Sequence, residues 1–317
     1  MGLLGIRSNQ VAGFLSCFVC LGISAANGQS SSAQPNLAVI PRARPAVERL
    51  PASTFRLDVK MIQVPVQVTD LLDRPVMNLP KVAFRLFEDD VEQDIATLSM
   101  ADAPISTGLV FDASRSMKDR IGESRVAVEQ FCLTSVPADE FFLVRFSDNA
   151  ELTSPFTRDT GEIRRQLSLV QPHGWTAMID AIWRSVEEMR RASNPRKVLL
   201  VLSDGGDNNS RYSEAELLSL VREADVRVYA IGLFQRPRYL EKLAEETGGK
   251  VIWVHKMSEL PEAMETLSLQ IRNEYVVGYF SKHAQKDGKY HKLRVEVQPP
   301  AGLKQVHASW RRGYVEP

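Results

Sequence analysis

The chain of 317 residues is 44% hydrophobic and 25% charged, which is the balance of a globular protein with one large or two modest domains. Its 39 Lys and Arg residues equal its 39 Asp and Glu residues, so the formal net charge is zero. This balance gives no overall basic excess that would indicate nucleic acid binding, and no acidic excess that would indicate a solvating tail.

The N-terminus has the pattern of a secretory signal. Arg7 precedes an apolar run over 11–26, which small residues close at 24–26. A basic start, a short apolar stretch and small residues near a cleavage point predict a signal peptide over residues 1–28. Because the run is shorter than the roughly 20 residues of a spanning helix, an uncleaved anchor is the second interpretation. No later apolar run reaches that length, so we expect an exported protein, periplasmic or extracellular, without a membrane span after signal removal.

Cysteine use agrees with this interpretation. Cys17 and Cys20 lie inside the apolar run, and signal removal would leave Cys132 alone, so we expect no internal disulfide. A lipid-modified Cys17 is a weaker alternative, because apolar sequence continues beyond it. Cys132 falls in a helical pattern and is expected in the core.

Strand-like segments flank the centre of the chain. Residues 29–52 are rich in Ser, Ala, Pro and Arg without a hydrophobic period, which predicts a flexible linker. Residues 53–102 then alternate apolar and polar side chains between polar turns, as antiparallel strands do. Three further strand-like runs occur within 273–317. Because a few short strands do not bury two faces alone, we expect the N- and C-terminal groups to complete one β-sandwich beside the central domain.

The central segment, 103–272, alternates strands with helices. Apolar runs predict strands at 105–111, 141–146, 198–202, 226–231 and 251–254. The run at 198–202 is continuously apolar, as in a strand that is buried on both faces. Ser213 and Glu216 form a capping box at the start of one helix. Repeated β-α units predict an α/β fold with a doubly wound, mostly parallel sheet and helices on both faces.

Oxygen-bearing side chains follow two of these strands and precede one helix. The first strand ends in Asp112, Ser114 and Ser116, the strand at 198–202 runs into Asp204, and Thr176 begins a helix. In an α/β sheet, ligands bind at the carboxyl ends of the strands. Three hydroxyls and two carboxylates at that edge make an all-oxygen site, which suits a hard cation such as Mg²⁺.

The order and spacing of these five residues resemble the metal-ion-dependent adhesion site of von Willebrand factor type A domains. The resemblance implies that Ser114, Ser116 and Thr176 contact the metal, Mg²⁺ or Mn²⁺. It also implies that Asp112 and Asp204 bind the metal directly or through water, and that an acidic group of a protein partner completes the coordination.

Nearly all of the predicted mature chain also resembles an exported, Acidobacteria-type subgroup of this family. The resemblance rests on the runs at 64–70, 84–89, 275–279 and 311–314. Two positions depart from the family pattern. Arg115 and Trp175 stand where small residues are usual. The alternatives are that Arg115 crowds the site or pairs with an acidic partner and that Trp175 forms a rim contact, or that both are harmless loop variation.

Motifs for other activities are absent from the sequence. It has no G-x-S-x-G elbow, phosphate-binding loop, H-E-x-x-H or dinucleotide fingerprint. The five histidines lack metal-ligand spacing, and His173, the one nearest Thr176, is interpreted as a surface residue. We therefore expect no enzyme, catalytic residue or organic cofactor, but a metal-dependent protein-binding or adhesion module. The alternatives are an envelope assembly protein in which the cation only stabilises the fold and, as a minor hypothesis, a metal-assisted hydrolase.

Overall fold

The computed structural model describes residues 61–283 and 288–315. The predicted signal peptide, the linker and the first residues of the N-terminal β segment lie outside these ranges. Within them, no helix combines the length and the apolar character that crossing a membrane requires.

The centre of the chain forms a six-stranded sheet in the order β10-β9-β8-β5-β6-β7. The strands are parallel except β7, which runs antiparallel to β6 at one edge. Their bounds are β5 Ile105–Asp112, β6 Glu140–Phe146, β7 Ala150–Thr157, β8 Arg196–Ser203, β9 Arg227–Leu233 and β10 Val251–Val254. Every residue of β5 is buried, because it has a strand on each side and helices on each face. The predicted doubly wound, mostly parallel sheet is confirmed.

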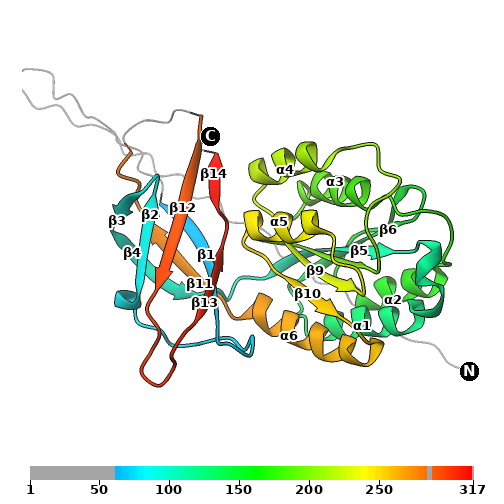
Figure 1. Cartoon of the computed structure of the whole chain (residues 1–317), viewed down its shortest axis with the longest axis horizontal. Helices are drawn as coiled ribbons and strands as arrows, with labels where there is room; N and C mark the ends of the chain where they lie inside the picture. The colour runs from blue at the N-terminus through cyan, green and yellow to red at the C-terminus, as the bar shows by residue number, and fades with distance from the viewer. Residues whose placement is uncertain (1–60, 284–287, 316–317) are drawn as a thin grey trace, which may run out of the picture. The chain divides into compact units, whose positions relative to one another are not determined.

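Six helices cover the two faces of this sheet (Figure 1). One apolar core joins α1, α2 and α6 to one face, and a second joins α3, α4 and α5 to the other. Their bounds are α1 Ile121–Leu133, α2 Thr160–Leu169, α3 Met178–Met189, α4 Glu214–Glu223, α5 Arg238–Thr247 and α6 Leu260–Arg272. The predicted capping box of Ser213 and Glu216 is present at α4. Cys132 is buried in the first core, as expected.

The flanking strands form two four-stranded antiparallel sheets, in the orders β13-β1-β11-β4 and β14-β12-β2-β3. The N-terminal strands are β1 Ile62–Thr69, β2 Phe84–Glu88, β3 Val91–Gln93 and β4 Ile95–Met100. The C-terminal strands are β11 Tyr275–Tyr279, β12 Tyr290–Val297, β13 His307–Trp310 and β14 Gly313–Val315. Each sheet mixes strands from both ends of the described chain, which confirms the predicted pairing.

The two antiparallel sheets enclose one apolar core, so together they form a sandwich. Val64, Val66 and Val68 of β1 face Leu86 of β2 and other apolar residues from both ends of the chain.

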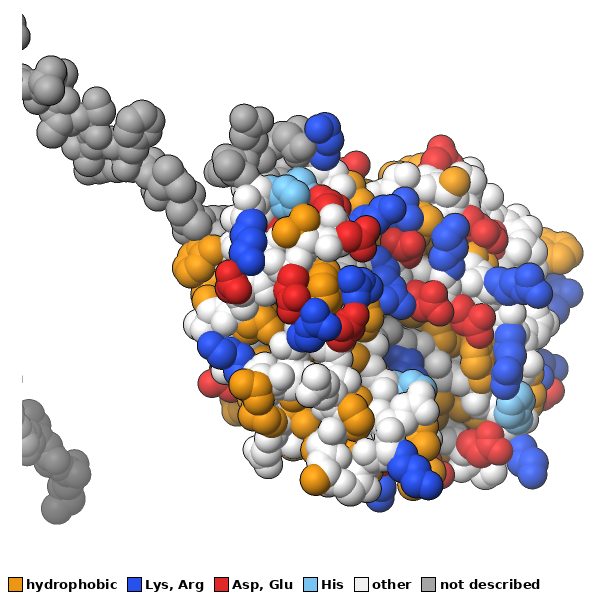
Figure 2. Space-filling model, turned by 60° about the vertical axis from the view of Figure 1, so that its left-hand side comes forward, with side chains coloured by type: hydrophobic (Ala, Val, Ile, Leu, Met, Phe, Trp, Pro, Cys, Tyr) orange, Lys and Arg blue, Asp and Glu red, His pale blue; other side chains and the backbone are white. Residues whose placement is uncertain are grey.

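Acidic and basic side chains alternate over the face shown in Figure 2 without a broad area of one sign. This mixture agrees with the zero net charge of the sequence.

Three elements of the fold were not predicted from the sequence. Strand β7 contains Pro155 and lies at the sheet edge, where alternation is weak and a missing N–H is tolerated. Helix α2 buries only Ile163 and Leu167, so its hydrophobic pattern is short. Strand β14 has three residues, and its pairing with β12 depends on a distant partner rather than on local sequence.

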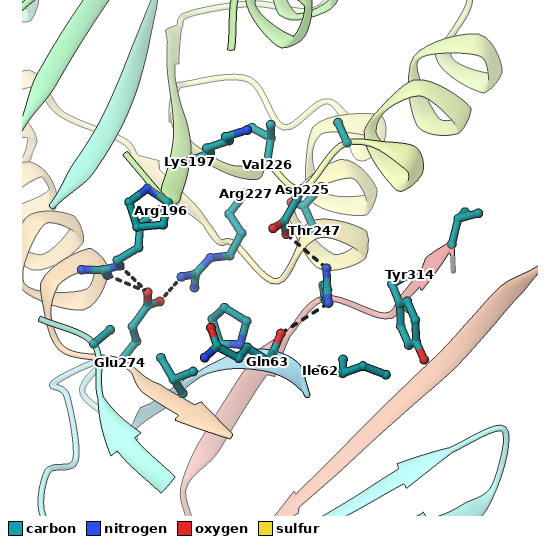
Figure 3. Close-up of a pocket in the computed structure, with 18 of the residues that line it drawn as sticks. Ile62, Gln63, Arg196, Lys197, Asp225, Val226, Arg227, Thr247, Glu274 and Tyr314 are labelled. Carbon is teal, nitrogen blue, oxygen red and sulfur yellow. Dashed lines mark hydrogen bonds and ion pairs between the residues drawn. The ribbon is translucent and has the colours of Figure 1, made fainter. Parts of the chain in front are cut away.

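A buried ion triad joins the sandwich to the central sheet. Glu274 directly precedes β11, and its side chain is 1% exposed. Its Oε1 accepts hydrogen bonds from Arg196 Nε at 2.9 Å and Nη2 at 2.6 Å, and its Oε2 pairs with Arg227. Figure 3 shows the carboxylate between the two guanidinium groups. Because Arg196 lies in β8 and Arg227 in β9, one carboxylate holds two strands of the central sheet beside the start of β11.

We expect Glu274→Gln to lower the free energy of unfolding by about 3–5 kcal/mol, because it leaves two largely buried guanidinium groups without their carboxylate. Urea denaturation at neutral pH measures the change. The control is Glu296→Gln, whose carboxylate pairs with Arg85 and Arg294 at an exposed surface and should matter little. Equal effects of the two substitutions would contradict this account of the triad.

Candidate metal centre

The site lies where two neighbouring parallel strands end. Strand β5 pairs with β8 with Phe111 opposite Leu202, so Asp112 at the end of β5 comes close to Asp204, which follows β8. Parallel strands place their carboxyl ends at one edge of the sheet, where polar loops replace the apolar interior. The buried register of β5 and β8 therefore fixes where these two carboxylates meet.

Asp112 is fully buried and strongly held. Its Oδ1 accepts a hydrogen bond from the amide of Ser114 at 2.8 Å, and its Oδ2 accepts one from the hydroxyl of Ser203. Burial raises the pKa of Asp112 to about 6. The hydrogen bonds from Ser114 and Ser203 oppose this rise, whereas the charge of Asp204 adds to it. Near neutral pH the site therefore brings together two carboxylates whose charges repel, which favours a bound cation.

A chain of hydrogen bonds links the other residues of this edge. The hydroxyl oxygens of Ser114 and Ser116 lie 3.0 Å apart, and Ser116 Oγ donates to Asp204 Oδ1 at 2.7 Å. Ser114 is buried, whereas Ser116 is exposed at the start of a short 3-10 helix, Arg115–Asp119. The structure thus brings four of the five predicted ligands into one hydrogen-bonded cluster.

Thr176 joins this cluster through the backbone of its loop. The amide of Arg115 donates to the carbonyl of Gly174 at 3.3 Å, and the amide of His173 donates to the carbonyl of Ala113 at 2.9 Å. The loop is held from the other side by Asn208, whose Oδ1 accepts from the amide of Thr176 at 2.9 Å. Thr176 is buried beside the two strand ends, and it is held there by backbone hydrogen bonds of its loop and by the side chain of Asn208.

The loop before Thr176 depends on a glycine. Gly174 has a φ of +70°, and a Cβ at this position would lie 2.1 Å from Oδ2 of Asp148. The other oxygen of Asp148 accepts from the amide of Trp175 at 2.9 Å. Positive φ and close approach both exclude larger residues here, so Gly174 and Asp148 together set the path of the chain into Thr176.

Arg120 is a functional residue that sequence reasoning missed. Its guanidinium forms an ion pair with Oδ2 of Asp204 and donates to the carbonyl of Ser116 at 3.2 Å. It also stacks over the ring of Phe234, 4.3 Å from the centroid. Only its position four residues after Ser116, just before α1, could have drawn attention to it. Arg120 supplies positive charge to the oxygen cluster from within the chain.

Exposed aromatic side chains stand near the site. Phe234 follows β9, is 42% exposed and has a φ of +70°, which is rare for a bulky residue and is often found at functional sites. Trp175 is 64% exposed next to Thr176. Arg115 is also exposed, so its side chain points away from the buried oxygens rather than filling their place.

Two further polar residues, His173 and Asp207, lie in the loops around the site. His173 is exposed, with its ring nitrogens 3.0 Å from Ser147 Oγ and 2.9 Å from the carbonyl of Gln171, as expected of a surface residue. Asp207 accepts hydrogen bonds from the amide of Ile179 at 3.0 Å and from the hydroxyl of Ser210. It therefore caps the start of α3 and takes no part in the oxygen cluster.

The donor set fits a hard divalent cation. Asp112 and Asp204 supply negative charge, Ser114 and Ser116 supply hydroxyl oxygens within the same cluster, and Thr176 supplies a third hydroxyl from the adjoining loop. Carboxylate, hydroxyl and water oxygens are the ligands that Mg²⁺ and Mn²⁺ accept.

Comparison with known proteins identifies the central domain. Residues 107–206 match the von Willebrand factor type A domain family. The centre of this chain is therefore similar to a von Willebrand factor type A domain, and we refer to it as the type A domain. The match includes Asp112, Ser114, Ser116, Thr176 and Asp204, and it leaves the two flanking groups of strands outside. No curated protein matches the chain in sequence.

Solved structures share the fold. A von Willebrand factor type A protein from Catenulispora acidiphila is 12% identical, covers 83% of this chain and 74% of its own length, and has a TM-score of 0.51. At this identity the likeness concerns the fold alone. Two others have TM-scores below 0.5. Proximal thread matrix protein 1 from the mussel byssus, with a zinc-occupied adhesion-site motif, is 21% identical over 56% of this chain and 48% of its own, at 0.48. The type V pilus tip domain from Porphyromonas gingivalis is 11% identical over 54% and 96%, at 0.47.

We expect Arg120→Gln to strengthen Mg²⁺ binding by the type A domain, because the guanidinium and the cation compete for Asp204. An ion pair of this partly exposed kind contributes about 1 kcal/mol, which corresponds to roughly a fivefold gain in affinity. Calorimetric titration of Mg²⁺ into chelator-treated protein measures it.

Arg115→Gln is the matched control for Arg120→Gln. It removes the same charge from the same loop, but Arg115 forms no ion pair with the site among the described residues. Its effect should be smaller than that of Arg120→Gln. Weaker binding in Arg120→Gln than in the unsubstituted protein would show that Arg120 supports the cation instead of competing with it.

Proposed function

We propose that this protein is an exported binding module in which Asp112, Ser114, Ser116, Thr176 and Asp204 hold Mg²⁺ or Mn²⁺, and that the cation coordinates an acidic side chain of a protein partner. The observation that carries the proposal is that two serines link the carboxylates of neighbouring strand ends. The amide of Ser114 donates to Asp112. The Ser114 hydroxyl lies 3.0 Å from that of Ser116, which donates to Asp204. The cation would supply positive charge to a partner's oxygen, which is the role of adhesion sites in type A domains.

The surroundings of the site suit a protein partner. Trp175 and Phe234 are exposed aromatic residues close to it, and such residues often contribute most to binding when a partner covers them. Arg115 and Arg120 add positive charge on the same side of the sheet, which favours an acidic partner. These features support docking of a surface rather than enclosure of a small molecule.

Binding is favoured over hydrolysis by the groups around the oxygen cluster. Catalysis by a metal-bound water needs a base within hydrogen-bond reach of the reacting group. The nearest histidine by sequence, His173, has its ring nitrogens beside Ser147 and Gln171. Asp207 is engaged by the start of α3. We therefore propose that the protein is not an enzyme.

Location outside the cytoplasm is part of the proposal and rests on residues 1–28 of the sequence, with their basic start, apolar run and small residues. A module that holds Mg²⁺ and an acidic partner would act on surfaces in the periplasm or outside the cell. Detection of the cleaved chain in those fractions, against retention at full length in the membrane, distinguishes a signal peptide from an uncleaved anchor.

We expect Asp204→Asn to weaken Mg²⁺ and Mn²⁺ binding more than tenfold, because it removes a charged ligand while keeping an oxygen that Ser116 can bond. Calorimetric titration of each ion into chelator-treated protein measures the loss. Asp207→Asn is the control, since it makes the same chemical change a few residues away at a carboxylate that caps α3. Saturable binding of equal strength in both variants would overturn the assignment of the site.

The partner's chemistry can be tested with displayed peptides. Peptides selected on the protein in Mg²⁺ should contain Asp or Glu, should be released by chelator, and should fail to bind Asp204→Asn. If Mg²⁺ raises the melting temperature but selected peptides bind equally well in chelator, the cation only stabilises the fold and the adhesive role is wrong.

A further inference from the structure

A second group of metal-binding side chains lies in the β-sandwich, away from the type A site. Asp89 lies in the turn between β2 and β3, His283 follows β11, and His291 lies in β12. One nitrogen of each imidazole and one carboxylate oxygen of Asp89 lie within 4.8 Å of one another. Across residues 61–283 and 288–315, no other three His, Cys, Asp or Glu side chains bring their ligand atoms so close together.

The backbone fixes Asp89 in this cluster. Asp89 and Asp90 have φ angles of 47° and 65°, as in the two-residue turns that join adjacent antiparallel strands. Two hydrogen bonds join Asp89 to the backbone of Lys292. The Asp89 amide donates to the Lys292 carbonyl, and Asp89 Oδ1 accepts from the Lys292 amide, both at 2.9 Å. Its second oxygen, Oδ2, is thereby directed at His291 Nδ1, 2.7 Å away.

His283 is brought to the same place by a different set of contacts. Ser281 Oγ donates to Glu88 Oε2 at 2.6 Å and accepts from the amide of His283 at 3.1 Å, which ties the chain after β11 to the end of β2. The Nε2 atom of His283 is buried without a hydrogen-bond partner in the described part of the chain, 4.0 Å from Asp89 Oδ2. A buried nitrogen of this kind calls for an explanation, and a bound ion would provide one.

The inner wall of the cluster is buried and polar. The His291 ring lies between those of His283 and Tyr314, with centroids 5.6 Å from each. Behind it, Glu88 is buried and accepts a hydrogen bond from the Tyr314 hydroxyl. Its Oε1 lies 4.0 Å from His291 Nδ1. At 4.0 Å Glu88 does not hydrogen-bond the ring, but its carboxylate adds negative charge beside the cluster, which favours a bound cation.

We propose that Asp89, His283 and His291 form a second metal site, which binds a transition-metal ion of the Zn²⁺ class. Two imidazole nitrogens select Zn²⁺, Co²⁺ or Ni²⁺ over Mg²⁺, in contrast to the all-oxygen type A site. Three protein ligands leave a position for water or for a partner's side chain. The ion would connect the β2–β3 turn, the chain after β11 and β12. Asp89 Oδ2 lies 2.7 Å from His291 Nδ1 and 4.0 Å from His283 Nε2. The ion would therefore replace the hydrogen bond between Asp89 and His291 and draw the His283 ring closer, to reach bonds of about 2.0–2.1 Å.

The proposed second site is independent of the function of the type A domain. The test uses Asp204→Asn to remove metal binding by that domain from the measurement. Zn²⁺ and Co²⁺ are titrated into the full chain carrying Asp204→Asn, followed by calorimetry and by the visible absorption of bound Co²⁺. We expect saturable binding of one ion to this variant, unaffected by millimolar Mg²⁺.

Two further substitutions locate the ion. In the same background, His283→Ala and Asp89→Asn should each weaken Zn²⁺ binding by more than about tenfold. Asn keeps an acceptor for Lys292 and tolerates positive φ, so Asp89→Asn tests the ligand without disturbing the turn. The control is His307→Ala, which removes an exposed histidine of β13 in the same sandwich and should leave binding unchanged. No Zn²⁺ or Co²⁺ binding, or equal binding in His283→Ala and His307→Ala, would overturn the proposal.

Discussion

The burial of Asp112 beside Asp204 is the constraint on which the architecture of the site depends, because burial is the main cause of its raised pKa and the charge of Asp204 adds to it. Both carboxylates lie at the carboxyl ends of strands whose register is set by the apolar core, so the chain cannot separate them without disrupting the sheet. Positive charge must therefore come to them, and the protein provides it in one form through Arg120. In the proposed function a divalent cation would provide it in another form, in competition with Arg120 for Asp204.

The same physical difficulty, a buried carboxylate, is resolved differently elsewhere in the chain. Glu274 is neutralised by Arg196 and Arg227, and this fixed triad connects the start of β11 to two strands of the type A sheet. Glu88 is held by the hydroxyls of Tyr314 and Ser281 with an imidazole close by. A carboxylate that is fully paired with guanidinium groups, such as Glu274, holds elements of the fold together. A carboxylate surrounded by hydroxyls or imidazoles can still accept a metal ion. That difference separates the interdomain triad from the two places where we propose metals.

The sandwich ties the ends of the domain together. β1 pairs with β11 on one side and with β13 on the other, so a strand that precedes the type A domain lies between two that follow it. Helix α6 leads through Glu274 directly into β11. Any movement of α6 would therefore reach a sheet that is closed by strands from both sides of the type A domain.

The sequence by itself determined the features that depend on local pattern. Continuous apolar runs indicated the buried parallel strands, alternation indicated the flanking strands, and Asp112, Ser114 and Ser116 with Thr176 and Asp204 indicated an oxygen site. Tertiary structure alone decided the strand order of the sandwich, the edge strand β7, the pairing of Arg120 with Asp204, and the meeting of Asp89 with His283 and His291. Arg120 and Asp204 are 84 positions apart in the sequence, and Asp89 and His291 are 202 positions apart. Local hydrophobic periodicity carries no information about such pairs, because they form only when the closing of the sheets and the packing of loops bring distant segments together.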